Sequence, residues 1–198
     1  MISEYQQQLR HRFLSVPETA PPAPWEPVLK GRTPIGGLQG IGFAVAPDTG
    51  HDLVMVVSSQ GHGLFDAVTG ERMARDRDPD ADDCTPDGVR VLSCPGLGPI
   101  AGTPVSIAGL FGGGLHTTSG DGWSLDVVSP EWPHHRVLLS RGGGMPHRGP
   151  HGEHWWHIFD SNYSELRTAG FSPSGRTLAV ATSSDITLWT RPTAAASS

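Results

Sequence analysis

Short apolar segments recur along the chain from about residue 40 onward, and turns rich in glycine and proline separate them. In the stretch TLAVAT, residues 177–182, threonine and alanine alternate with Leu178, Val180 and Thr182. A two-residue period is typical of a strand, because successive side chains point to opposite faces. The 26 glycines and 18 prolines disfavour long helices. The pattern therefore predicts short antiparallel strands joined by hairpins.

A helical period precedes these strands. Four apolar residues recur at steps of three and four, which places them on one helical face: Ile2, Tyr5, Leu9 and Phe13. Ser3 and Gln6 have the spacing of a capping box, so we expect a helix that ends at about Leu14. Such a helix either docks on a partner or packs on its own domain and covers an exposed sheet edge.

Three stretches share one order of features: an apolar strand, a turn, a second strand that opens at a leucine, a polar turn and a third strand. They cover residues 40–71, 104–131 and 166–191. The leucines that open the second strands are Leu53, Leu115 and Leu178, at spacings of 62 and 63 residues. A near-constant spacing is typical of an internal repeat, so we expect three units of about 62 residues each.

The expected domain organisation has four parts. Five prolines follow the helix and predict an extended arm. The small residues at the C-terminus predict a disordered tail. We therefore predict, in order, a helix over 1–14, a proline-rich arm over 15–28, a three-unit β domain over 29–191 and the tail over 192–198.

The third stretch contains a specific turn motif. Its sequence, LRTAGFSPSGRTLAVATSSDITLWTR, places Pro173 where it presets φ of a turn and Gly175 where a positive φ is needed. The F-S-P-x-G turn, the following L-A-V-A strand and the I-x-L-W strand resemble a blade of the WD-repeat β-propellers. The resemblance is clear over 166–191, looser over 40–71, and reduced to the strand pattern over 104–131.

This resemblance implies an all-β fold of three propeller-blade-like antiparallel units with a short N-terminal helix. Blades of the family usually have about 40–45 residues, and closed propellers typically have about four to eight blades. The expected units are longer and fewer. Three arrangements therefore remain open: a compact toroid, an open array completed by a partner or a second copy, and a three-fold barrel of the β-trefoil type.

Charge and apolar content argue against two classes of partner. The formal net charge is −6 and no block of lysine and arginine is present, which argues against nucleic acid. The longest purely apolar runs, such as 54–57, are only a few residues long, which argues against a membrane span. No secretory signal opens the chain, so we expect a cytoplasmic protein in which Cys84 and Cys94 are free thiols, with a bridge between them as the alternative.

Four histidines and two tryptophans crowd the segment HRGPHGEHWWHIF, residues 147–159. A zinc site could draw its ligands from these histidines: His147, His151, His154 and His157. A strand over 153–159, however, sends the last two histidines to opposite faces, so they cannot both bind one ion. The alternatives are a sheet strand with aromatic residues on both faces, or a protein-binding surface anchored by Trp155, Trp156 and Tyr163.

An acidic stretch, ARDRDPDADDCTPDG, lies between the first two units. Its alternating aspartates are similar to those of a calcium loop, but Ala81 stands where that loop needs glycine and Asp87 where it needs a bidentate glutamate. We therefore expect a solvated loop in which three aspartates attract a basic partner: Asp80, Asp82 and Asp83.

These features together predict a non-enzymatic protein-interaction module without a cofactor, such as an adaptor or an immunity-type protein of a bacterial toxin system. Its partner is expected to be another protein, a basic one in particular, and a homo-oligomer is expected if the three units do not close a ring. No catalytic residue is assigned. Two alternatives remain: a metal-binding protein or metal-dependent enzyme that uses the loop 147–157, and a lectin-like carbohydrate binder.

Overall fold

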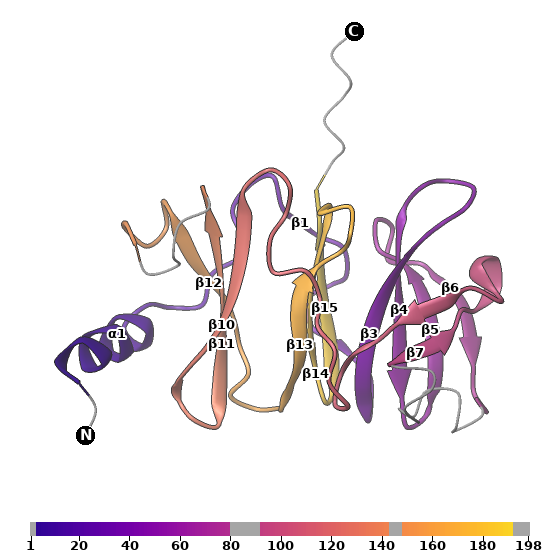
Figure 1. Cartoon of the computed structure of the whole chain (residues 1–198), viewed down its shortest axis with the longest axis horizontal. Coiled ribbons are helices and arrows are strands. Elements are labelled where there is room, and N and C mark those ends of the chain that lie inside the picture. Colours follow the sequence, from indigo (N-terminus) through magenta and orange to yellow (C-terminus); the bar gives the residue numbers. More distant parts are fainter. Residues whose placement is uncertain (1–2, 80–91, 143–147, 192–198) are drawn as a thin grey trace, which may run out of the picture.

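The computed structural model describes residues 3–79, 92–142 and 148–191 (Figure 1). In this part of the chain, antiparallel strands form four separate sheets rather than one closed barrel, and an α-helix of 11 residues lies at the N-terminus. The expected all-β class is confirmed. None of the described helices has the length and apolar character that a membrane crossing requires.

Three of the sheets are large and are named first, second and third in chain order. The first sheet has the strand order β6 (Arg72–Asp76), β5 (Gly61–Asp66), β4 (Asp52–Ser58), β3 (Leu38–Val45) and β9 (Ala108–Gly109). The second has the order β10 (Trp123–Glu131), β11 (His134–Arg141) and β12 (Trp155–Asp160). The third contains β13 (Leu166–Phe171), β14 (Thr177–Thr182) and β15 (Asp185–Thr190), and both β1 (Glu26–Pro27) and β2 (Thr33–Pro34) pair with β15.

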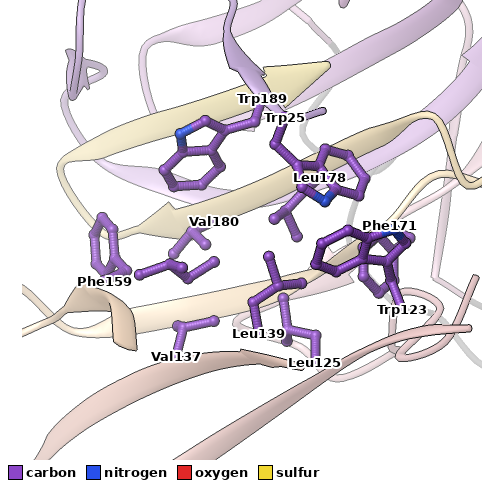
Figure 2. Packing of buried hydrophobic residues seen from close by; sticks show 11 residues of the cluster. Trp25, Trp123, Leu125, Val137, Leu139, Phe159, Phe171, Leu178, Val180 and Trp189 are labelled. Atoms are coloured by element: carbon purple, nitrogen blue, oxygen red, sulfur yellow. The ribbon is translucent and has the colours of Figure 1, made fainter. Parts of the chain in front are cut away.

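The large sheets stack face to face in the order second, third, first, so the C-terminal sheet is the central one (Figure 1). The contact between the second and third sheets is the aromatic junction, and Figure 2 shows its side chains converging between the strands: Trp25, Trp123, Leu125, Val137, Leu139, Ile158, Phe159, Phe171, Leu178, Val180 and Trp189. The contact between the third and first sheets is the aliphatic junction. Its buried residues are Leu38, Ile41, Val54, Val56, Ala67, Ala179, Ala181, Ile186 and Leu188.

Strand β14 contributes side chains to both junctions. Leu178 and Val180 point into the aromatic junction, whereas Ala179 and Ala181 point into the aliphatic junction, and all four are fully buried. This division follows from the two-residue period of the strand. The alternation of larger and smaller residues in the sequence therefore determines which face of the central sheet carries bulk.

Each end of the stack has its own cover. Helix α1 (Glu4–Leu14) lies on the outer face of the second sheet, where Phe13 packs edge-on against Trp155 at a centroid distance of 6.0 Å. The helix starts at Ser3 with the predicted capping box to Gln6, and it covers a sheet face rather than an edge. The small sheet of β7 (Ser93–Pro95) and β8 (Pro104–Ser106), with the 3-10 helix η2 (Gly98–Ile100), covers the outer face of the first sheet.

Two irregular segments protect strand edges. Residues 107–119 cross the three large sheets and pair with β3, β13 and β10 in turn, through Gly109 with Gly40, His116 with Phe171, and Thr118 with Ser124. The N-terminal arm runs along the opposite edges, where the Thr19 amide donates to the His157 carbonyl at 2.8 Å and β1 and β2 pair with β15. Unpaired strand edges are prone to aggregation. Because these two segments cover strand edges, the sheets need not close into a ring to protect them.

The expected repeat of about 62 residues is wrong for its middle unit. Leu53 and Leu178 lie in the second strands of the first and third sheets, but Leu115 lies outside any strand and packs against the aliphatic junction. Leu125 lies in the first strand of the second sheet. The second sheet is built from residues 123–160, later in the chain than the leucine spacing predicts.

The prediction of a free thiol is wrong for Cys94. Cys94 is buried in the layer that covers the first sheet, and it is disulfide-bonded rather than a free thiol. Cys84 and the tail 192–198 lie outside the described residues. Disulfides are more typical of oxidising compartments than of the cytoplasm.

Candidate functional site

The histidine-rich segment is divided between a loop and a strand, because β12 starts at Trp155. His157 is buried, with its Nε2 3.0 Å from the Phe159 carbonyl oxygen and its Nδ1 3.4 Å from that of Val16. Burial lowers the pKa of His157, and the positive charge of Arg136 lowers it further. The imidazole is therefore held neutral and contacts the N-terminal arm where the arm crosses the second sheet.

The other described histidines of this segment have separate surroundings. His151 packs edge-on against Trp155, with ring centroids 4.8 Å apart, and burial lowers its pKa. His154 precedes the strand, and its ring carbon lies 2.8 Å from where a Cβ would stand on Gly149. His147 lies outside the described residues. Within the ranges that the structure covers, no three histidine, cysteine, aspartate or glutamate residues are grouped so that they could hold a metal ion.

The three aromatic residues predicted as partner anchors differ in exposure. Trp155 is fully buried beneath α1, so its assignment to a binding surface is wrong. Trp156 is half-buried at the aromatic junction, with its ring 6.0 Å from that of Trp123. Tyr163 is 49% exposed, and the Arg32 guanidinium lies 4.5 Å over its ring. The acidic residues predicted beside them lie outside the described residues: Asp80, Asp82 and Asp83.

The hydroxyl of Tyr163 fixes the position of this exposed ring. It donates a hydrogen bond to Asp185 Oδ2 at 2.9 Å. Burial raises the pKa of Tyr163 well above its usual value, and the Asp185 carboxylate raises it further. Tyr163 therefore stays a neutral donor and is held to the first residue of β15.

Trp132 is an exposed residue that the sequence reasoning did not single out. Its side chain is 77% exposed in the turn between β10 and β11, and its ring meets His135 edge-on at a centroid distance of 5.7 Å. The Nδ1 atom of His135 lies 2.8 Å from Ser129 Oγ across the hairpin. Arg10 of α1 donates from Nε to the Pro130 carbonyl at 2.7 Å. The available signal was a tryptophan in the polar turn SPEWPHH.

A buried carboxylate joins the third sheet to the first at the aliphatic junction. The Oδ2 atom of Asp52, at the start of β4, accepts hydrogen bonds from the side chains of Ser172, Ser174 and Thr177 at 2.8, 2.7 and 2.8 Å. The three donors belong to the F-S-P-S-G-R-T turn between β13 and β14. A single carboxylate oxygen therefore fastens this turn to the neighbouring sheet.

A histidine–aspartate pair lies next to that carboxylate. The Nδ1 atom of His51 is 2.9 Å from Asp66 Oδ2. Burial raises the pKa of Asp66, but hydrogen bonds from His51 and from the Thr69 and Val68 amides outweigh it, so the pKa falls below its usual value. In the part of the chain that is described, the nearby hydroxyls donate to Asp52 and none is hydrogen-bonded to the His51 ring. The pair therefore supports the turn that follows β5.

Two cavities lie at the aliphatic junction. One, of about 280 Å³, is at the Asp52 end of β4, and its walls include His51 and Arg191. The other, of about 300 Å³, is at the Ser58 end, between the first sheet and the segment that begins with β2. Volumes of this size are at the lower limit for pockets that bind small ligands.

Comparisons of the chain with protein-family models, with curated proteins and with solved structures find no match.

Proposed function

We propose that the chain is a non-enzymatic protein-interaction module whose anchor is Trp132. The observation that carries this proposal is the 77% exposure of this tryptophan. Its ring packs against His135 of the same hairpin, and Arg10 of α1 is hydrogen-bonded to the hairpin. Leaving a large ring in water forgoes the free energy of burying it, and tryptophan is enriched at the energetic centres of protein interfaces. A partner with an apolar pocket would bury the ring without first having to order the hairpin.

The scaffold beneath this anchor supports the same role. Gly175 adopts φ +70° in the F-S-P-S-G turn, and β13, β14 and β15 form consecutive antiparallel hairpins. We propose that the third sheet, and more loosely the first, are related to WD-repeat blades. A rigid β scaffold that presents an aromatic turn suits an adaptor or an immunity-type protein that neutralises a partner.

The test is affinity capture with the immobilised wild-type chain and the Trp132→Ala variant, from an extract of the native source. A protein captured by the wild type is then purified and titrated by calorimetry. Because a central tryptophan typically contributes 2 kcal/mol or more, the variant should bind roughly thirtyfold more weakly or worse.

The matched control is Phe111→Ala, because Phe111 is another exposed aromatic residue, at 49%, in a segment on the first-sheet side. The control should bind with the wild-type affinity. Equal affinities for wild type and Trp132→Ala, with the loss confined to Phe111→Ala, would contradict the proposal.

A further inference from the structure

Strand β6 carries two arginines on the face where the first sheet packs toward the third. Gly63 pairs with Arg75 and Phe65 with Arg72, and the register shifts between Leu64 and Phe65. Met73 is therefore the extra residue of a β-bulge, which returns Arg72 to the side occupied by Arg75. Without the bulge, residues three apart on a strand would point to opposite faces.

The bulged Met73 is 40% exposed to solvent on one side of this edge strand. Both arginines are exposed as well, and on the other side they line the cavity of about 300 Å³. Edge strands commonly carry bulges and charges as protection against aggregation, whether the charges point inward or outward. Two cations that share one wall of a cavity also offer a site for an anion.

Neither of these guanidiniums has a partner in the described part of the chain, where no hydrogen bond or ion pair holds Arg72 or Arg75. Other arginines do have carboxylate partners: Arg32 with Glu18, Arg136 with Asp160, Arg167 with Glu165 and Arg191 with Asp121. Two like charges side by side on one sheet face repel each other. An anion between them would remove that repulsion.

The rest of the cavity is suited to an apolar group. Phe65, Val56 and Ile35 form part of its wall, and the Gln60 side chain borders it at Gly36. Gly63 has no side chain and so leaves the floor of the cavity open. A Cβ added there would stand only 3.1 Å from the Phe65 ring and would take up part of this space.

We propose that this cavity binds a small organic oxyanion, with its phosphate or carboxylate group on Arg72 and Arg75 and its apolar body against Phe65. Guanidinium groups match both oxyanions because they donate two parallel hydrogen bonds. The cavity volume limits the ligand to a small metabolite and excludes a folded partner. The site is independent of Trp132, which lies on the second sheet.

The test is calorimetric titration of the full chain at low salt with phenyl phosphate, phenylacetate and inorganic phosphate. Low salt is chosen because dissolved salt screens the attraction between an anion and exposed charges. We expect saturable one-to-one binding of at least one of the two aromatic anions, with inorganic phosphate weaker. The aromatic anion that binds more tightly identifies the oxyanion as phosphate or carboxylate.

Two variants and one control locate the binding. Replacing both cavity arginines, Arg72→Gln with Arg75→Gln, should weaken it by roughly tenfold or more, because two charge-assisted hydrogen-bond donors are lost. Gly63→Val keeps both charges and fills the floor, so it should also abolish binding of the aromatic anions. Arg77→Gln is the matched control, since Arg77 is exposed just beyond β6 and does not line the cavity.

Melting temperatures confirm that each variant folds. The proposal is overturned if no aromatic anion binds the wild type, if Gly63→Val binds as the wild type does, or if Arg77→Gln weakens binding as much as the double variant. The last two results would indicate a diffuse attraction of anions to surface charge.

Discussion

The two junctions between the large sheets are built from different side chains, although both use β14. The aromatic junction is filled by rings, with Trp25 from the arm 5.9 Å from Trp123 and 5.7 Å from Phe171 (Figure 2). The aliphatic junction is filled on its β14 side by Ala179 and Ala181. It also contains the Asp52 hydrogen bonds and the cavities of about 280 and 300 Å³.

This difference predicts that stability and ligand binding depend on different junctions. Large rings bury more apolar area per residue than methyl groups, so the aromatic junction should contribute most of the free energy of unfolding. The two cavities lie at the ends of the aliphatic junction, and polar side chains border them. We therefore expect substitutions to affect stability mainly at the first junction and ligand binding mainly at the second.

The largest effect is expected at the aromatic junction. Trp123→Ala removes a ring that packs against Trp25 and Trp156, and it should lower the free energy of unfolding by about 3–5 kcal/mol. Urea denaturation followed by circular dichroism measures the change. A loss below about 1 kcal/mol, far under the usual range for a buried tryptophan, would show that the rings do not carry this junction.

Neighbouring positions on β14 allow the junctions to be compared directly. Leu178→Ala leaves a cavity at the aromatic junction and should cost about 2–5 kcal/mol. Ala179→Leu overfills the aliphatic junction and should cost about 1–3 kcal/mol. Thermal and urea denaturation of both variants give the order, and a stabilising Ala179→Leu would mean that the aliphatic junction is loosely packed.

A smaller effect is expected from the buried carboxylate. Asp52→Asn replaces an acceptor of three hydroxyl hydrogen bonds and should lower the free energy of unfolding by about 1–3 kcal/mol. Asp48→Asn, at an exposed turn just before β4, is the matched control and should change little. If both substitutions lowered the free energy of unfolding equally, Asp52 would have no special role in joining the sheets.

The smallest effect is expected from pH. The pKa of His157 is lowered in the folded chain, so the unfolded chain binds more protons below the ordinary histidine pKa of about 6.5. The stability from this neutral histidine is complete above that pH and declines as the pH falls toward the lowered pKa. Melting temperatures between about pH 8 and pH 5 should fall less steeply for His157→Gln than for the wild type. Parallel curves would remove His157 from the pH response.

The local pattern of the sequence was enough to predict the helix and the strands of the third sheet. The helix has its cap at Ser3 as expected, and β13, β14 and β15 occupy the predicted stretch. The prediction for the middle unit was wrong because Leu115 packs against the core from an irregular segment. A partly buried leucine in a loop has the same sequence signal as one in a strand. The stacking order also depends on long-range pairing, which a local period does not encode.

The candidate sites were harder to predict for the same reason. The strand period correctly puts Trp155 and Trp156 on opposite faces, but it cannot show that α1 covers one of them. Phe159 joins Trp156 and not Trp155, because the register shifts between Val137 and Leu138. The cavity arginines likewise depend on a bulge that only the pairing partner reveals.

The measurement that separates the two junctions most directly is a nuclear magnetic resonance titration of the isotope-labelled chain with phenyl phosphate and phenylacetate. Binding at the aliphatic junction predicts shifts of the amides of Gly36, Gln60 and Gly63, which border the cavity, with those of Leu139 and Phe171 unchanged. Shifts that spread over both junctions, or that gather at the aromatic junction, would contradict the division between a filled junction that stabilises the chain and an open one that binds a ligand.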